Sequence, residues 1–131
     1  MAGLTHPANV WPDLEGLVIA ALRAALPDVQ ADTETGPDMQ RRLPMALVQQ
    51  VPGGGGDGVV EQQSLLDVSW FAADRSAMWQ LAGRGHAVLV NLDGVDLVLP
   101  RDPPASVPYN NPGVFRAIST YQITTRATGR A

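Results

Sequence analysis

The feature that most constrains this fold is a strand that runs directly into a long helix, over residues 65–92. Side chains in the first part alternate between two faces, and the face with Leu66, Val68 and Trp70 is fully apolar. Asp74 is the expected helix N-cap, because its carboxylate can accept hydrogen bonds from the free amides of the first turn. Apolar residues at helical spacing then predict a buried stripe of Met78, Leu81, Ala82, Gly85, Val88, Leu89 and Leu92.

A different stripe of the same helix carries Arg75, Trp79 and His86, away from most of the apolar stripe. A large aromatic residue beside charged residues on the outer side of a core helix indicates a contact surface. We therefore interpret Arg75 and Trp79 as candidate interface residues. The alternative is that Trp79 packs against the edge of the sheet.

Patterns in the rest of the chain predict one more helix and several strands. An apolar stripe predicts a helix over residues 12–26, with Pro12 in its first turn and Pro27 ending it. Glycine-rich residues 52–58 are expected to form a flexible loop that closes a β-hairpin. The expected strands cover residues 29–33, 45–51, 59–72, 95–99 and 114–126.

Residues 100–112 contain five prolines, which is typical of an extended loop and incompatible with a central strand. In the strand that follows, Phe115, Ala117, Tyr121 and Ile123 share one face, which we assign to the core. The opposite face is polar, and it is either an ordinary solvent-facing side or the wall of a channel or a subunit interface. This polar face consists of Arg116, Thr120, Gln122, Thr124 and Arg126.

The order of these elements predicts an α+β fold, with two helices packed on one face of a small, mostly antiparallel sheet of about four strands. A chain of 131 residues without an internal linker or repeat fits one domain. We expect residues 1–10 and 127–131 to be flexible arms.

Composition and motifs give no support for catalysis, a metal or a cofactor. The chain lacks cysteine, and its two histidines, His6 and His86, have no second ligand at metal-binding spacing. Gly53, Gly55 and Gly58 match a dinucleotide-binding spacing, but a strand rather than a helix is expected next. We expect a protein that is not an enzyme.

The charge balance and the apolar segments also restrict the partners. A net charge of −4 argues against a free-standing nucleic-acid binder, and the Arg41–Arg42 pair is too small to form a basic patch. No apolar run approaches the length of a membrane span, and residues 1–10 do not resemble a signal peptide. We expect a soluble protein made in the cytoplasm.

Six segments, spread along nearly the whole chain, resemble the tail terminator (tail completion) proteins of long-tailed bacteriophages. They are LEGLV at 14–18, LPMALV at 43–48, DVSWFA at 67–72, AMWQLA at 77–82, NPGVFR at 111–116 and TYQI at 120–123. Each is a pattern rather than an invariant motif, and their order together with the chain length carries the likeness. Gly83 and Gly85 inside the second helix fit less well, since each costs about 1 kcal/mol relative to alanine. They permit close packing of the helix or mark a kink.

The resemblance implies a structural subunit of a six-fold ring, without a cofactor. Such a ring caps the tail tube, ends tail elongation and offers the surface that joins the head. Its partners would be further copies of the chain, the major tail tube protein and a head-tail connector or head-closure protein. Genome DNA would pass through the lumen without being read, and the protein would reside in the virion at the junction of tail and neck, after assembly in the host cytoplasm.

Two groups of residues are candidates for these contacts. The subunit interface is predicted at Arg75, Trp79, Arg116, Thr120, Gln122 and Thr124. Contacts with tube or neck are predicted at two loops, which contain Gly53, Gly54, Gly55, Gly56, Asp57 and Gly58, and Tyr109, Asn110 and Asn111. Two alternative functions remain open at this point: a neck or head-closure connector, and a small α+β ligand-binding regulatory domain.

Overall fold

The computed structural model describes residues 12–56 and 61–126, which fold into an α+β arrangement of two helices and a five-stranded sheet. The predicted arms at residues 1–10 and 127–131 lie outside this range, as do Asp57 and Gly58 of the predicted loop. The elements are α1 (Leu14–Ala25), β1 (Gln30–Asp32), η1 (Met39–Arg42), β2 (Met45–Gly56), β3 (Glu61–Ala72), α2 (Arg75–Val90), β4 (Leu97–Val107) and β5 (Phe115–Arg126).

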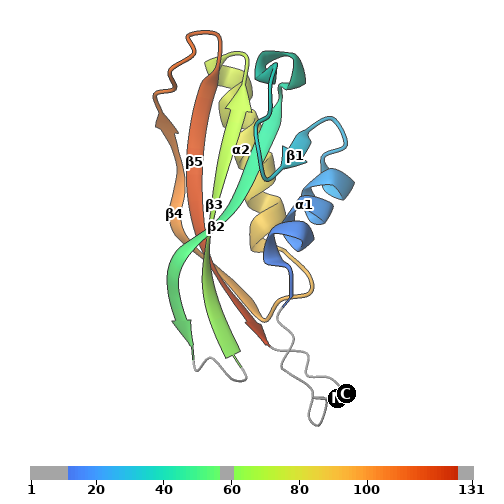
Figure 1. Cartoon of the computed structure of the whole chain (residues 1–131), viewed down its shortest axis with the longest axis vertical. Coiled ribbons are helices and arrows are strands. Elements are labelled where there is room, and N and C mark those ends of the chain that lie inside the picture. The colour runs from blue at the N-terminus through green and yellow to red at the C-terminus, as the bar shows by residue number, and fades with distance from the viewer. Residues whose placement is uncertain (1–11, 57–60, 127–131) are drawn as a thin grey trace, which may run out of the picture.

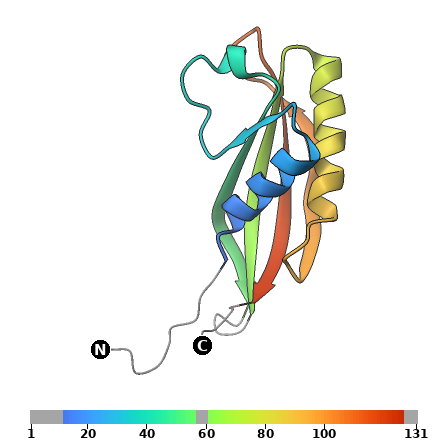
Figure 2. The same ribbon diagram turned by 90° about the vertical axis from the view of Figure 1, so that its right-hand side faces the viewer.

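The sheet has the strand order β1-β2-β3-β5-β4, and every neighbouring pair is antiparallel except β1 and β2. Both α-helices lie on the same side of it (Figure 2), where α2 contacts β3, β4 and β5, and α1 contacts β1, β2 and α2. The predicted fold class is thus confirmed. The sheet has five strands rather than about four.

The main core lies between this side of the sheet and the two helices. Trp70 and Tyr121 are its two largest fully buried side chains. Leu66 and Val68, on the predicted apolar face of β3, are fully buried as well. Gly85 of α2 faces the Trp70 ring so closely that an added Cβ would lie 2.2 Å from two ring atoms. This glycine therefore permits close packing of α2 on the sheet, whereas Gly83 has nothing within 4 Å of such a Cβ.

Both helices begin as their sequences predict. The Asp13 carboxylate accepts a hydrogen bond from the Gly16 amide at 3.0 Å, and the Asp74 carboxylate accepts one from the Ala77 amide at 2.8 Å. These bonds satisfy amides that have no partner within the helix. The tight passage from β3 into α2 is therefore encoded locally, by the capping aspartate directly after the strand.

The glycine-rich segment differs from its prediction, because Gly53 to Gly56 belong to β2 and not to a flexible loop. Gly55 and Gly56 pair with Gln63 and Gln62, after a break in register that begins at Val51. Gly53 and Gly54 have φ angles of 128° and 94°, and a Cβ on Gly54 would lie 2.0 Å from the Gln63 carbonyl oxygen. The glycines allow a bulge, after which the strand continues. A strand, β3, follows in place of the helix that a dinucleotide site needs.

The proline-rich segment also differs from its prediction as an extended loop. Pro100, Pro103 and Pro104 lie within β4, which begins at Leu97 and pairs with β5 through two breaks in register. Because β4 is an edge strand, its outer side needs no backbone donors, and prolines are tolerated there. The expectation that this segment cannot be a central strand holds. The loop assignment was wrong for residues 100–107, whereas Pro108 and Pro112 lie in the connection after β4.

One end of the sheet carries a smaller core on the side away from the helices. Met45 and Phe71 are buried there against Val114, with Met39, Leu43, Leu47 and Tyr109 packed around them. η1, the start of α2 and the β4–β5 connection gather at this end, at the top of Figure 1.

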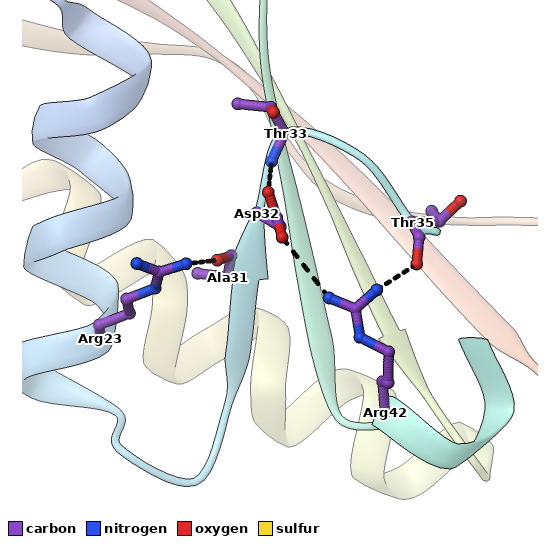
Figure 3. Close-up of polar contacts among 6 residues, drawn as sticks. All are labelled: Arg23, Ala31, Asp32, Thr33, Thr35 and Arg42. Carbon is purple, nitrogen blue, oxygen red and sulfur yellow. Dashed lines mark hydrogen bonds and ion pairs between the residues drawn. The ribbon is translucent and has the colours of Figure 1, made fainter. Parts of the chain in front are cut away.

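The Arg42 side chain binds two residues of the segment that precedes η1, Thr35 and Asp32 (Figure 3). Its guanidinium donates to the Thr35 carbonyl at 2.6 Å and lies 3.5 Å from the Asp32 carboxylate at the end of β1. On the other side of β1, Arg23 of α1 donates to the Ala31 carbonyl at 2.9 Å. Two arginines thus hold the short edge strand from both sides, and Arg42 is a structural residue.

Candidate functional site

The side of the sheet that faces away from α1 and α2 is uncovered over much of its length, and we call it the open face. Neither α1 nor α2 covers it (Figure 2), and only the end near Phe71 is packed over, by η1 and loop residues. The strand registers place its side chains in rows across the sheet. One such row is Val51, Leu65, Gln122 and Leu99, and the next toward the Phe71 end is Gln49, Asp67 and Thr120.

Apolar and polar side chains alternate along the open face. Leu97 and Leu99 expose 49% and 45% of their surface, and Val51 and Leu65 are partly buried. In the polar row, the Thr120 hydroxyl donates to the Asp67 carboxylate at 2.7 Å. A face that combines exposed leucines with internally paired polar groups is typical of a protein interface rather than of a solvated sheet surface.

Four of the six predicted interface residues lie on this face. Arg116, Thr120, Gln122 and Thr124 point to the same side of β5, as their alternation predicts. Thr124 is already buried, whereas Thr120 and Gln122 are partly accessible. The residues of β5 predicted to face the core are buried, except Phe115, which exposes 38% of its surface at the start of the strand.

The other two predicted interface residues, Arg75 and Trp79, lie on the exposed side of α2. Trp79 exposes 40% of its surface, which leaves a large aromatic area available for contact, and its assignment to the interface stays a prediction. The Arg75 guanidinium lies 6.0 Å from the Trp79 ring and donates to the Ser106 hydroxyl of β4 at 3.3 Å.

His86 does not extend this exposed stripe, which corrects the grouping of Arg75, Trp79 and His86. Its Nδ1 lies 2.7 Å from the hydroxyl of buried Tyr121, and the two rings are 5.5 Å apart. The Trp70 Nε1 group donates to the Ser119 hydroxyl at 2.9 Å in the same core. Burial raises the pKa of Tyr121 to about 12, and the Ser119 hydroxyl opposes part of that rise. Helical spacing alone does not reveal that the His86 ring turns toward Tyr121.

A pocket of about 450 Å³ lies where α2 begins and the β4–β5 connection turns back. We call it the arginine pocket, because Arg75 and Arg116 both line it. Tyr109 and Asn111, predicted as contact-loop residues, line it as well. The remaining wall is mostly apolar and consists of Ser106, Val107, Pro108, Pro112, Val114 and Phe115.

Arg116 is held in this pocket by neutral groups. Its guanidinium donates to the Pro108 carbonyl at 3.0 Å and lies 5.1 Å from the Tyr109 ring centre. The Arg116 Nε atom is inaccessible to solvent and has no hydrogen-bond partner in the described structure. Tyr109 itself packs edge-on against Phe71, with ring centres 5.2 Å apart.

Three other arginines are paired with carboxylates. Arg42, Arg84 and Arg126 form ion pairs with Asp32, Asp28 and Asp96 at 3.5, 2.9 and 2.5 Å. The Arg84 guanidinium lowers the pKa of Asp28, and Asp96 raises the pKa of Arg126. Over residues 12–56 and 61–126, no carboxylate pairs with Arg75 or Arg116.

The two predicted contact loops lie at opposite ends of the sheet. Gly55 is in the row with Gln63, Thr124 and Leu97, at one end, whereas Tyr109 contacts Phe71 at the other. Sequence reasoning placed Arg75 and Arg116 in the subunit interface and Tyr109 and Asn111 in a separate contact loop. The strand pairing of β4 with β5 brings the two groups together, and no sequence signal gave that pairing once residues 100–107 were assigned to a loop.

Leu97 and Leu99 are interface candidates that sequence reasoning missed. Their alternation at the start of β4 could have identified them, since both point to the same side of a strand. The described residues hold no group of three His, Asp or Glu side chains able to bind a metal ion, and neither described helix is long and apolar enough to cross a membrane.

With this geometry in view, comparison with known proteins identifies no family: no family model and no curated protein matches the chain.

Proposed function

We propose that this chain is a structural subunit of a ring that caps a bacteriophage tail tube, ends tail elongation and joins the tail to the head. The resemblance of six ordered segments to tail terminator proteins motivates this function. The observation that carries it furthest is the open face, a sheet surface of mixed polarity with two exposed leucines, which α1 and α2 leave uncovered. Such a surface fits permanent contact with another protein better than contact with water.

A cyclic ring requires two different patches on each subunit, because one patch meets the other on the neighbouring copy. The open face and the exposed side of α2 with Arg75 and Trp79 lie on opposite sides of the sheet and differ in character. They are the two patches we assign to the ring contact.

The two ends of the sheet are candidates for the axial contacts. The Gly55 end and the Tyr109 end lie at opposite ends of the strands (Figure 1), so strands running along the ring axis would present one end to each neighbour. One end would meet the tail tube protein and the other a connector or head-closure protein. The net charge of −4 suits a lumen through which DNA passes without being retained.

Electron microscopy of particles made without the gene tests this function. We expect overlong or head-free tails, and we expect wild-type protein supplied in trans to restore tail length and head attachment. The matched missense control is Arg84→Gln, which removes a surface ion pair away from both patches. Tails of normal length attached to filled heads in the absence of the gene would exclude the proposal.

A neck or head-closure connector is the second candidate, since the same open face could serve a ring on the head side. The same experiment separates the two functions. Loss of a head-closure protein would leave tail length unchanged and block only the joining of head and tail.

A further inference from the structure

We infer that the arginine pocket is a binding site for a carboxylate, presented by an acidic side chain of a protein partner. The first observation is its charge: Arg75 and Arg116 both line the pocket, and no described carboxylate pairs with either. Arg42, Arg84 and Arg126 have aspartate partners, whereas Arg23, Arg41 and Arg101 also have none among the described residues. Arg75 and Arg116 differ from those three because both line the same pocket. Two cations without counter-charges in one hollow create a local positive potential that attracts an anion.

The second observation is that both guanidiniums are positioned but not saturated. Arg116 donates one hydrogen bond to the Pro108 carbonyl, and Arg75 donates one to the Ser106 hydroxyl. A guanidinium carries five N–H donors in a fixed fork, so each retains donors for a ligand. The Arg116 Nε group is hidden from solvent and lacks a partner, so the donors open to a ligand are the other N–H groups of the two guanidiniums.

The surroundings favour a single negative charge on a protein segment. The Asp74 carboxylate caps α2 directly before Arg75 and would repel a doubly charged phosphate more than a carboxylate. The largely apolar walls, including Val107, Pro108 and Phe115, suit the aliphatic stem of an acidic side chain and its neighbours.

The kind of partner rests on the proposed function, whereas the carboxylate site does not. Arg116 belongs to the open face and also lines the pocket, so a protein seated on the open face can reach into it. In the proposed ring, an Asp or Glu of the neighbouring copy, which is the protein assigned to the open face, fills the pocket. Assembly would then neutralise the two unpaired cations.

The binding step is tested on the isolated protein by following the ¹⁵N-labelled arginine Nε–Hε signals in nuclear magnetic resonance. The probe is N-acetyl-aspartate N-methylamide, which mimics an aspartyl residue, at constant ionic strength. The matched neutral probe is the corresponding asparagine compound. We expect saturable shifts of the Arg75 and Arg116 signals with the aspartate probe only.

Arg101 is the internal control, because it is an exposed arginine whose side chain donates to the neutral Gln122 amide at 3.3 Å. The variants Arg75→Gln and Arg116→Gln assign the signals, and each should weaken binding about tenfold, as expected for a lost charged hydrogen bond. Arg75→Gln alters an exposed side chain and should not disturb folding. The site would be overturned by shifts at Arg101 that equal those at Arg75 and Arg116 and do not saturate, or by no shift at all. A second titration uses inorganic phosphate as the probe. Tighter binding of phosphate than of the aspartate compound would overturn the assignment to a carboxylate.

The partner is tested by supplying Arg75→Gln/Arg116→Gln protein to phage that lack the gene, with Arg101→Gln as control. We expect the double variant to fail in ring formation and the control to succeed. If gene loss changes the tails but the double variant restores them, the terminator function stands and the assigned partner contact is wrong. If gene loss leaves tails and heads unaffected, the ring proposal fails, and the probe titration alone still decides the carboxylate site.

Discussion

On the helix-covered side of the sheet, Trp70, Tyr121 and Leu66 are fully buried, whereas on the open face Leu97 and Leu99 expose 49% and 45% of their surface. The same strands supply both sides by simple alternation. The covered side is completed within the chain by α1 and α2, and its polar groups, such as the Trp70 indole, find partners there. The open face retains leucines and threonines that α1 and α2 leave uncovered.

This difference separates apolar residues that build the core from apolar residues that the folded chain leaves exposed. Stability comes from the covered side, where each side chain has an intramolecular neighbour. The open face and the arginine pocket have features that the isolated chain leaves uncompensated: exposed leucines in one case and unpaired guanidiniums in the other. Substitutions on the two sides should therefore have separable effects.

The largest expected difference is between adjacent leucines of β3. Leu66→Ala removes a fully buried side chain from the covered side and should cost about 2–5 kcal/mol in the free energy of unfolding. Leu65→Ala, on the open face, should cost only about 1 kcal/mol, because that side chain is partly accessible already. Urea denaturation measures both. Equal losses would show that the open face is part of the folding core.

The second comparison uses the two glycines of α2. Gly85→Ala places a methyl group against the Trp70 ring and should destabilise by about 1–3 kcal/mol, since the helix must move away from the sheet. Gly83→Ala has free space and should stabilise by up to about 1 kcal/mol through helix propensity. Thermal unfolding of both variants checks this. A stabilising Gly85→Ala would mean that α2 packs less closely than its contacts indicate.

The third prediction concerns pH. Burial raises the pKa of Tyr121 above that of an unfolded tyrosine, so the unfolded state binds fewer protons once pH exceeds its own pKa of 10. The contribution of Tyr121 to the free energy of unfolding is fully present below pH 10. It falls by up to about 2 kcal/mol as pH rises toward 12.

Tyr121→Phe should be less stable at neutral pH, because the bond to His86 is lost, but its stability should fall less between pH 10 and 12. Denaturation at a series of pH values measures the decline, with Tyr109→Phe as the control that keeps Tyr121. An identical decline in all three proteins would assign the alkaline loss to other groups.

The smallest effect on folding is expected from Leu99→Ser on the open face. Its unfolding free energy should change by no more than about 0.5 kcal/mol, because nearly half of the side chain is exposed. Assembly should weaken, and so should that of Trp79→Ala on α2, as measured by native mass spectrometry with tail tubes present. An unfolded Leu99→Ser monomer, or unchanged assembly of both variants, would remove these residues from the interface.

Local signals in the sequence were enough for several elements. Asp13 and Asp74 predict the helix starts, because a cap is an interaction over three residues. The two faces of β3 and most of β5 follow from alternation. The glycines of β2 and the prolines of β4 mislead for the same reason: their usual role is in loops, but a bulge and a sheet edge each accommodate them inside a strand.

The candidate site was predictable in parts but not as a unit. Arg116, Thr120, Gln122 and Thr124 share a face by period two, and the structure places them on one side of β5. The arginine pocket joins α2 to both ends of the β4–β5 connection, and those segments are about 30 to 40 positions apart in the chain. Their meeting depends on the register of β4, which residue patterns near the prolines do not reveal.

The sequence by itself therefore determined the α+β class, the helix caps, the faces of the strands and the strand-to-helix passage over residues 65–92. Each of these depends on neighbours within a few residues. Only the tertiary structure decided which side of the sheet α1 and α2 leave open, where His86 points, and that two unpaired arginines line one pocket. These features depend on the pairing of distant strands, a balance of burial and hydrogen bonding over the whole sheet that no local pattern encodes.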